Sequence, residues 1–175
     1  MDKLEIVTDE SGNEVVLLPE IIFSNKQNIN WNDVEDYLGK YVGELIEIAE
    51  TRDIIYIGNK FPDEYGGSSY TRKTKGARAK AKANAAQGIR EMVEIATDKV
   101  YRENHKEKHS EDAHNGWFYY VTRFAIPLYN NEKKTGEYNV YSACLVVNHA
   151  ANGKMYLYDV VGIKKEASNP LKTIK

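Results

Sequence analysis

The stretch of sequence on which the fold depends runs from Arg72 to Leu128 and reads RKTKGARAKAKANAAQGIREMVEIATDKVYRENHKEKHSEDAHNGWFYYVTRFAIPL. Its first half is rich in Ala, Lys and Arg, and its apolar residues recur at steps of three and four, the spacing of one helix face. These residues are Ala81, Ala85, Ile89, Met92, Val93, Ala96 and Val100. The pattern predicts one long helix, followed by a run that carries three of the four histidines and then by an aromatic strand.

Six basic residues precede this helix or lie in its first turns. A buried charge without a partner is costly, so we expect all six side chains to point outward. They are Arg72, Lys73, Lys75, Arg78, Lys80 and Lys82. Such a cationic surface is typical of proteins that bind nucleic-acid phosphates.

The charge of the chain is unevenly distributed, although its net charge is only −2. Residues 1–64 hold 15 acidic and 5 basic residues, a net of −10, whereas residues 65–175 hold 11 acidic and 19 basic residues, a net of +8. Two interpretations stay open. The two parts attract each other across the fold, or the basic part is a surface for a polyanion.

Length and composition predict one domain spanning residues 1–175, with a hairpin in 1–20, a core in 21–171 and a frayed tail at 172–175. Cys144 is the only cysteine, which excludes an internal disulfide and a multi-cysteine metal site and favours a reducing compartment. The sequence has no signal-peptide core and no apolar run near the roughly 20 residues of a membrane span. We therefore expect a soluble, cytoplasmic protein.

The other elements follow from shorter patterns. Two β-prone runs, residues 4–7 and 14–18, flank a string of turn formers and predict a hairpin. A second long helix is expected from about Asn32 to Glu50, a strand at 54–57, and an antiparallel meander of strands at 117–128, 138–147 and 154–163. The expected fold class is α+β, with the hairpin and two long helices packed on the meander.

The histidines offer two kinds of chemistry. His105 and His109 are four residues apart, as on one helix face, and His114 follows, so a zinc site is one alternative. Lys106 and Lys108 would repel a dication, and the usual metalloprotease spacing is absent, so we predict no metal. The second alternative is a general acid/base histidine, His109 or His114, with Lys108 or Arg123 stabilising negative charge on a phosphate. The third alternative is that these histidines are simply solvated.

Aromatic and acidic residues in the meander leave further alternatives. Tyr156 and Tyr158 share one strand face and, with Trp117 and Tyr119, offer surfaces on which bases could stack. Cross-strand packing is the competing explanation. Asp159 fits poorly as an exposed residue of its strand, and we expect it to bind backbone groups or Arg123. The loop at residues 60–75, with its carboxylates, glycines and tyrosines, is either functional or an ordinary connector.

Several motifs together resemble a large polyvalent protein-associated domain, a module of long multidomain proteins of phages, plasmids and conjugative elements. The similarity covers about residues 21–171. The motifs are Glu64 with Ser69-Tyr70-Thr71, Lys80-Ala81-Lys82-Ala83-Asn84-Ala85, Lys108-His109, Gly116-Trp117, Thr122-Arg123-Phe124-Ala125-Ile126-Pro127, Tyr138-Asn139, Tyr156-Leu157-Tyr158-Asp159-Val160, Ile163-Lys164-Lys165-Glu166 and Pro170-Leu171.

This resemblance implies a mobile-element protein that acts on nucleic acid, RNA more than DNA, without a cofactor. Relatives of such modules are similar to the barnase/EndoU/RelE nuclease superfamily, which cleaves RNA without metal. The resemblance implies Lys108, His109, Arg123 and Tyr158 as active residues and Glu64 as a base, although the paired histidines of the EndoU branch are not found. The alternatives are a non-catalytic protein that binds nucleic acid or inhibits a host defence protein, and a structural packaging module.

Overall fold

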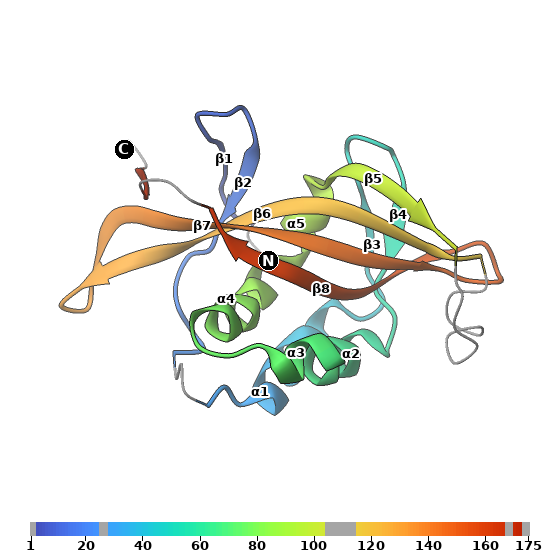
Figure 1. Cartoon of the computed structure of the whole chain (residues 1–175), viewed down its shortest axis with the longest axis horizontal. Coiled ribbons are helices and arrows are strands. Elements are labelled where there is room, and N and C mark those ends of the chain that lie inside the picture. The colour runs from blue at the N-terminus through green and yellow to red at the C-terminus, as the bar shows by residue number, and fades with distance from the viewer. Residues whose placement is uncertain (1–2, 25–27, 104–114, 167–169, 173–175) are drawn as a thin grey trace.

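Three long antiparallel strands form the centre of the molecule. The computed structural model describes residues 3–24, 28–103, 115–166 and 170–172. Strand β6 (Trp117–Asn130) pairs with β7 (Lys133–His149), which pairs with β8 (Met155–Lys165). The predicted meander is therefore present. The strands are longer than their sequence patterns indicated, and they cross the whole molecule (Figure 1).

Shorter strands extend this meander into a mixed sheet with the order β1-β2-β6-β7-β8-β4-β3. The hairpin of β1 (Ile6–Thr8) and β2 (Glu14–Leu17) joins one side through a parallel pairing of β2 with β6. On the other side β4 (Ile54–Tyr56) pairs in parallel with β8 and carries β3 (Leu45–Glu47). Strand β5 (Thr97–Arg102) pairs with β6, and β9 (Leu171–Lys172) pairs with β7.

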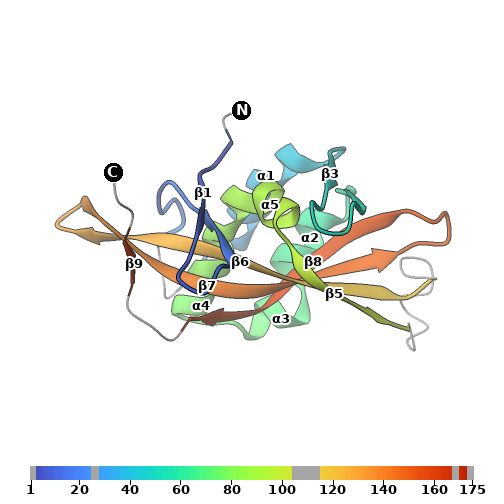
Figure 2. The ribbon, with the colours of Figure 1, turned by 90° about the horizontal axis from the view of Figure 1, so that it is seen from above.

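The helices are short and lie against the curled sheet, which forms a half-barrel (Figure 1). They are α1 (Trp31–Leu38), α2 (Phe61–Gly67), α3 (Ser69–Lys73), α4 (Ala77–Ala85) and α5 (Ile89–Glu94), with 3-10 turns at Gly39–Tyr41 and Ala86–Gly88. Figure 2 shows α1 and α5 on one side of the long strands. Asn30 caps α1, because its side-chain oxygen accepts the N–H groups of Asn32 and Asp33.

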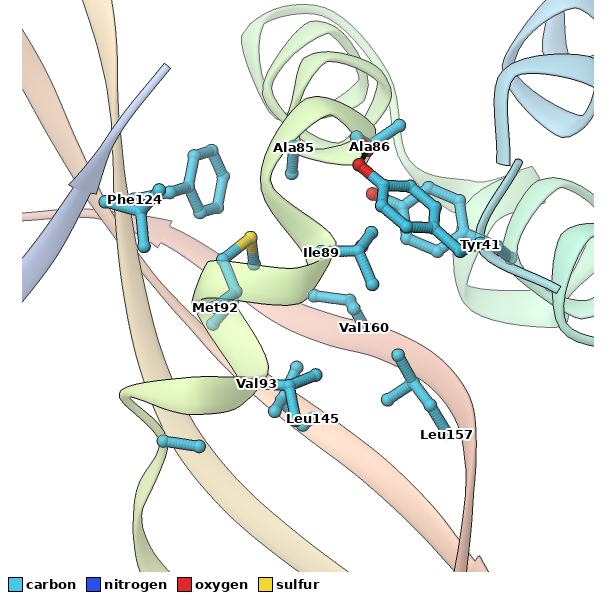
Figure 3. Close-up of a cluster of buried hydrophobic side chains, with 14 of the residues drawn as sticks. Tyr41, Ala85, Ala86, Ile89, Met92, Val93, Phe124, Leu145, Leu157 and Val160 are labelled. Atoms are coloured by element: carbon cyan, nitrogen blue, oxygen red, sulfur yellow. Dashed lines mark hydrogen bonds between the residues drawn. The ribbon is translucent and has the colours of Figure 1, made fainter. Parts of the chain in front are cut away.

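The main core lies between α5 and the concave face of the sheet (Figure 3). Ile89, Met92 and Val93 of α5 are fully buried, and they pack with residues of the long strands such as Phe124 and Leu145. Small residues on α4 and the following turn allow the helix to approach its neighbours closely. The core therefore uses the apolar face that the sequence pattern identified, but it does so with short helices.

The prediction of two long helices on a meander sheet is wrong. The helix predicted from Asn32 to Glu50 ends at Leu38. Gly43 turns the chain at a φ of 93°, and Leu45–Glu47 then forms a strand. Burial alternates from one residue to the next in that strand, as in other β-strands, so the prediction of a helix over residues 45–50 is wrong.

The Ala-rich helix predicted after Arg72 is also broken into shorter pieces. Gly76 has a φ of 64° and separates α3 from α4, and a 3-10 turn that ends at Gly88 separates α4 from α5. Val100, expected on the helix, lies in β5. Lys172, the first residue of the expected frayed tail, pairs with Glu137 of β7, and residues 173–175 lie outside the described ranges. No helix within the described ranges is long and apolar enough to cross a membrane.

Candidate nucleic-acid interface and pocket

Four of the six predicted basic residues lie on the surface near α3 and the start of α4. Arg72 and Lys73 end α3, Lys75 follows it, and Arg78 lies in the first turn of α4. All four side chains are exposed, and none forms an ion pair with another described residue. Their charge is therefore available to a ligand.

The end of β8 contributes further cations beside them. The hydroxyl of Tyr70 accepts the backbone N–H of Ile163 at 2.8 Å, which fixes α3 against this strand. Lys164 and Lys165 follow Ile163 directly, and both are exposed. We call the set Arg72, Lys73, Lys75, Arg78, Lys164 and Lys165 the basic surface.

The prediction that all six basic side chains point outward is wrong for Lys82. This residue is fully buried, and its Nζ lies 2.7 Å from Oδ1 of Asp159 and 2.6 Å from Oγ1 of Thr71. The ammonium also lies over the rings of Tyr65 and Tyr70. A buried cation with these partners cannot contact a phosphate. The sixth residue, Lys80, is half-buried.

Of the two predicted kinds of partner for Asp159, the backbone alternative is confirmed, because its Oδ1 accepts the N–H of Val160. Its charged partner is Lys82 and not Arg123, which pairs with Glu166. Burial raises the pKa of Asp159 and lowers the pKa of Lys82, while the attraction between the two charges opposes both shifts. Asp159 also lies at an irregularity in the pairing of β7 with β8. The adjacent residues Val146 and Val147 pair with Asp159 and Leu157, which are two positions apart. Tyr158 is thus the extra residue of a β-bulge, a feature that re-aims side chains and often occurs near functional sites.

A pocket of about 310 Å³ lies where the start of α2 meets this part of β8 and the turn between β7 and β8. It is lined by Gly58, Asn59, Lys60, Phe61, Glu64, Asn148, Ala150, Asn152, Tyr156, Leu157 and Tyr158. Polar side chains thus alternate with aromatic and small apolar ones. This mixture is typical of sites that orient a small ligand.

Asn148 has an unusual place in this wall. Its side chain is buried, with 7% of the residue exposed, and its Oδ1 has no hydrogen-bond partner among the described residues. Buried polar atoms in native proteins are nearly always paired, so this unpaired acceptor, which is itself inaccessible to solvent, is an exception. Asn148 is not among the site residues predicted from the sequence. The only signal was a polar residue directly after the apolar run Leu145-Val146-Val147.

The structure brings together two of the predicted catalytic residues and separates a third from them. Glu64 and Tyr158 line the pocket. Arg123 instead forms an ion pair of 2.9 Å with Glu166. It pairs with Ser142 and lies six residues along β6, about 20 Å, from Trp117, whose ring contacts that of the pocket residue Tyr158. Lys108 and His109 lie outside the described residues, as do His105 and His114.

Aromatic residues next to the pocket pack against each other. The ring of Trp117 meets that of Tyr158 edge to face at 5.0 Å, and Tyr156 packs on Tyr56 at 5.6 Å. Trp117 belongs to a small cluster with Val146, Tyr119 and other strand residues, on the sheet face opposite Tyr120 and the main core. Cross-strand packing, the alternative to base stacking, thus accounts for much of their contact.

In the part of the chain that the structure describes, no three His, Cys, Asp or Glu residues lie close enough to hold a metal ion. Comparisons of the chain with protein-family models, with curated proteins and with solved structures each found no match. The resemblance to polyvalent protein domains therefore stays a prediction.

Proposed function

We propose that this protein binds nucleic acid through the basic surface, as expected for a mobile-element protein that acts on RNA or DNA. The observation that carries the proposal is the group of exposed cations on α3 and α4 beside Lys164 and Lys165, none of them in an ion pair with another described residue. Among the described residues, the acidic N-terminal part forms no ion pair with them. Its ion pairs to the basic part, Glu44 with Arg90 and Asp53 with Lys99, lie elsewhere.

The pocket and the basic surface lie along one strand. Tyr158 lines the pocket, and Ile163 is the residue of β8 to which α3 is attached. Five residues of a strand span about 17 Å. A single strand of a few nucleotides can cover this distance, so its phosphates would contact the cations while one nucleotide reaches the pocket. This arrangement favours single-stranded nucleic acid, whose bases are accessible.

Binding of a fluorescent single-stranded RNA or DNA, measured by anisotropy at several salt concentrations, tests this proposal. The variant Lys73→Glu/Lys75→Glu should bind at least tenfold more weakly and should reduce the slope of log affinity against log salt by about 0.7 for each lost phosphate contact. The matched control Lys133→Glu/Lys134→Glu changes two exposed lysines at the β6–β7 turn and should bind like the wild type. Equal binding by both double variants would contradict the proposal. Salt-independent binding to a host protein would support the alternative of a protein partner.

Metal-independent cleavage of RNA is a second candidate, favoured by the shared position of Glu64 and Tyr158 in the pocket. A carboxylate can take the proton of a 2′-hydroxyl as that oxygen attacks the neighbouring phosphate, and cations stabilise the extra charge. The bond from phosphorus to the 5′-oxygen of the next nucleotide then breaks, and that oxygen takes up a proton from a general acid, the role predicted for His109. Cleavage should then persist in EDTA, be abolished by 2′-deoxy substitution, and fall at least a hundredfold in Glu64→Gln and in His109→Ala. No cleavage of any RNA would leave a binding protein. Full cleavage by folded Glu64→Gln would exclude this base.

A further inference from the structure

We infer that Tyr70 is a positioning residue that joins the two parts of the basic surface into one site for a short single strand of nucleic acid. One part of this surface lies on α3 and α4, and the other part is the end of β8. The inference rests on the proposed function and deepens it, since it states what aligns the cations and how short a strand they can hold.

The end of β8 contains a β-bulge. Ser142 and Cys144 of β7 are two positions apart, whereas their partners on β8, Lys164 and Val161, are three positions apart. Gly162 lies in this bulge with a φ of 60°, a conformation that glycine adopts without strain. A bulge interrupts the ladder of hydrogen bonds between two strands and re-aims the residues beside it. A backbone group of β8 can therefore bond to a side chain outside the sheet at this point.

The hydroxyl of Tyr70 forms that bond. It accepts the backbone N–H of Ile163 at 2.8 Å, although the two residues are 93 positions apart in sequence. The ring of Tyr70 also lies 5.0 Å from the ammonium group of Lys82. The side chain is thus held at both its ring and its hydroxyl, and Tyr70→Phe would remove only the contact with β8.

This contact sets where the cations lie relative to each other. Arg72 and Lys73 follow Tyr70 within one turn of α3. Lys165 lies two residues beyond Ile163, and because side chains alternate along a strand, it lies on the same sheet face as Ile163, which belongs to the main core under the helices. All three cations are exposed. A strand of nucleic acid bound here therefore meets both sets of charges at once.

Two other contacts hold α3, but neither lies beside the cations of β8. Its cap residue Ser68 hydrogen-bonds Asp159, four residues before the Tyr70 contact on the strand, which is about 13 Å. Thr71 binds Lys82 and so ties α3 to α4. A helix attached at its start alone can still turn about that point. The bond of Tyr70 is what fixes the basic end of α3 against the basic end of β8.

The length of the bound strand reveals this alignment. Domains that bind single strands use as few as about four nucleotides. A strand of that length contacts both parts of the basic surface only if the two parts are held side by side. A strand of twenty nucleotides can contact each part with different nucleotides, even if the parts move relative to each other. Loss of the Tyr70 contact should therefore weaken the binding of short strands more than that of long ones.

Anisotropy of fluorescent single-stranded RNA of four and of twenty nucleotides tests the inference. Tyr70→Phe should bind the short strand at least tenfold more weakly than the wild type does, and the long strand less than threefold more weakly. The matched control Thr74→Val removes a hydroxyl that bonds within α3, to the carbonyl oxygen of Tyr70 at 2.7 Å, and should bind both strands like the wild type. The amide proton of Ile163 should exchange at least tenfold faster in Tyr70→Phe, while the amides of the β6–β7 ladder keep their rates.

The outcomes separate this inference from the proposed function. Equal loss of affinity for both lengths in Tyr70→Phe, unchanged affinity for both, or unchanged exchange of the Ile163 amide would overturn the positioning role. The proposed function would still stand if Lys73→Glu/Lys75→Glu weakened binding of the long strand. No binding of either strand by the wild type would overturn the proposed function and this inference with it.

Discussion

The buried ion pair between Lys82 and Asp159 allows a prediction whose size and pH dependence both follow from the structure. In Lys82→Met the methionine retains most of the buried stem, so the main loss is the partner of the Asp159 carboxylate, whose side chain is only 4% exposed. Removing one member of a buried pair typically costs about 3–5 kcal/mol. The remaining carboxylate can limit this cost by taking up a proton.

Proton uptake sets the expected magnitude. Holding a carboxyl group with an unfolded pKa of about 3.9 in its neutral form costs about 4 kcal/mol at pH 7 and about 1.5 kcal/mol at pH 5. The pKa of Asp159 in folded Lys82→Met is raised, so the stability of this variant is fully present below the unfolded pKa and is lost as pH rises toward the folded pKa. Lys82→Met should therefore lie closest to the wild type in mild acid.

Asp159→Asn should show the opposite trend. The asparagine can still accept the N–H of Val160, so the variant mainly leaves Lys82 without its counter-charge. Neutralising a lysine with an unfolded pKa of about 10.4 costs about 5 kcal/mol at pH 7 and about 2 kcal/mol at pH 9. The folded pKa of Lys82 is depressed in this variant, so its stability is present above the unfolded pKa and is lost as pH falls.

Urea unfolding followed by circular dichroism at pH 5, 7 and 9 measures both trends. The double variant Lys82→Met/Asp159→Asn contains neither charge and should recover most of the loss at every pH, which gives a coupling free energy of several kcal/mol. Two results would refute the view that this pair is charged and buried away from water. One is a loss of unfolding free energy below about 1 kcal/mol in the single variants, and the other is a loss that does not change with pH in opposite directions in the two.

Two smaller predictions concern other parts of the fold. Burial raises the pKa of Asp53, but hydrogen bonds from Lys99, Thr51 and Tyr120 outweigh it, and the pKa is lowered overall from 3.8. Asp53→Asn should therefore cost about 1–3 kcal/mol at pH 7 by urea unfolding, and the difference from the wild type should disappear as pH falls below 3.8, because stability from a depressed pKa is lost there. A difference in unfolding free energy between Asp53→Asn and the wild type that stays the same in acid would contradict a lowered pKa for Asp53. Gly116→Ala should cost at least about 1–3 kcal/mol in the same assay, because Gly116 has a φ of 96° and a Cβ would lie 2.7 Å from the backbone oxygen of Arg102; unchanged stability would contradict this.

The sequence identified those parts of the fold whose signal is local. Residues 4–18 contain their own turn formers, and Asp9 indeed accepts the N–H groups of Ser11 and Asn13 in the β1–β2 turn. The alternation in residues 117–128 likewise predicted β6. The parallel pairings of β2 with β6 and of β4 with β8 join residues about a hundred positions apart, and no short-range pattern specifies them.

The same limit applies to the candidate site. Glu64 and Tyr158 were selected from the sequence, and they do line one pocket. Lys82 was misplaced because its partner lies 77 residues away in sequence. One clue was available, since Asp159 stands in an apolar strand where an acid needs a counter-charge, but neither propensity nor spacing indicates which cation supplies it.

The position of the ion pair suggests a role for it beyond stability, since apolar residues of similar volume are often equally stable at such sites. Lys82 also binds Thr71 of α3, the helix that carries Arg72 and Lys73, while Asp159 follows Tyr158 of the pocket. The pair thus connects the basic surface to the pocket through two bonds of 2.6 and 2.7 Å. If it aligns the two halves of one interface, the charge-free double variant should fold stably yet bind oligonucleotides more weakly than the wild type. Undiminished binding in a stable double variant would show that sheet and helices hold this alignment without the charges.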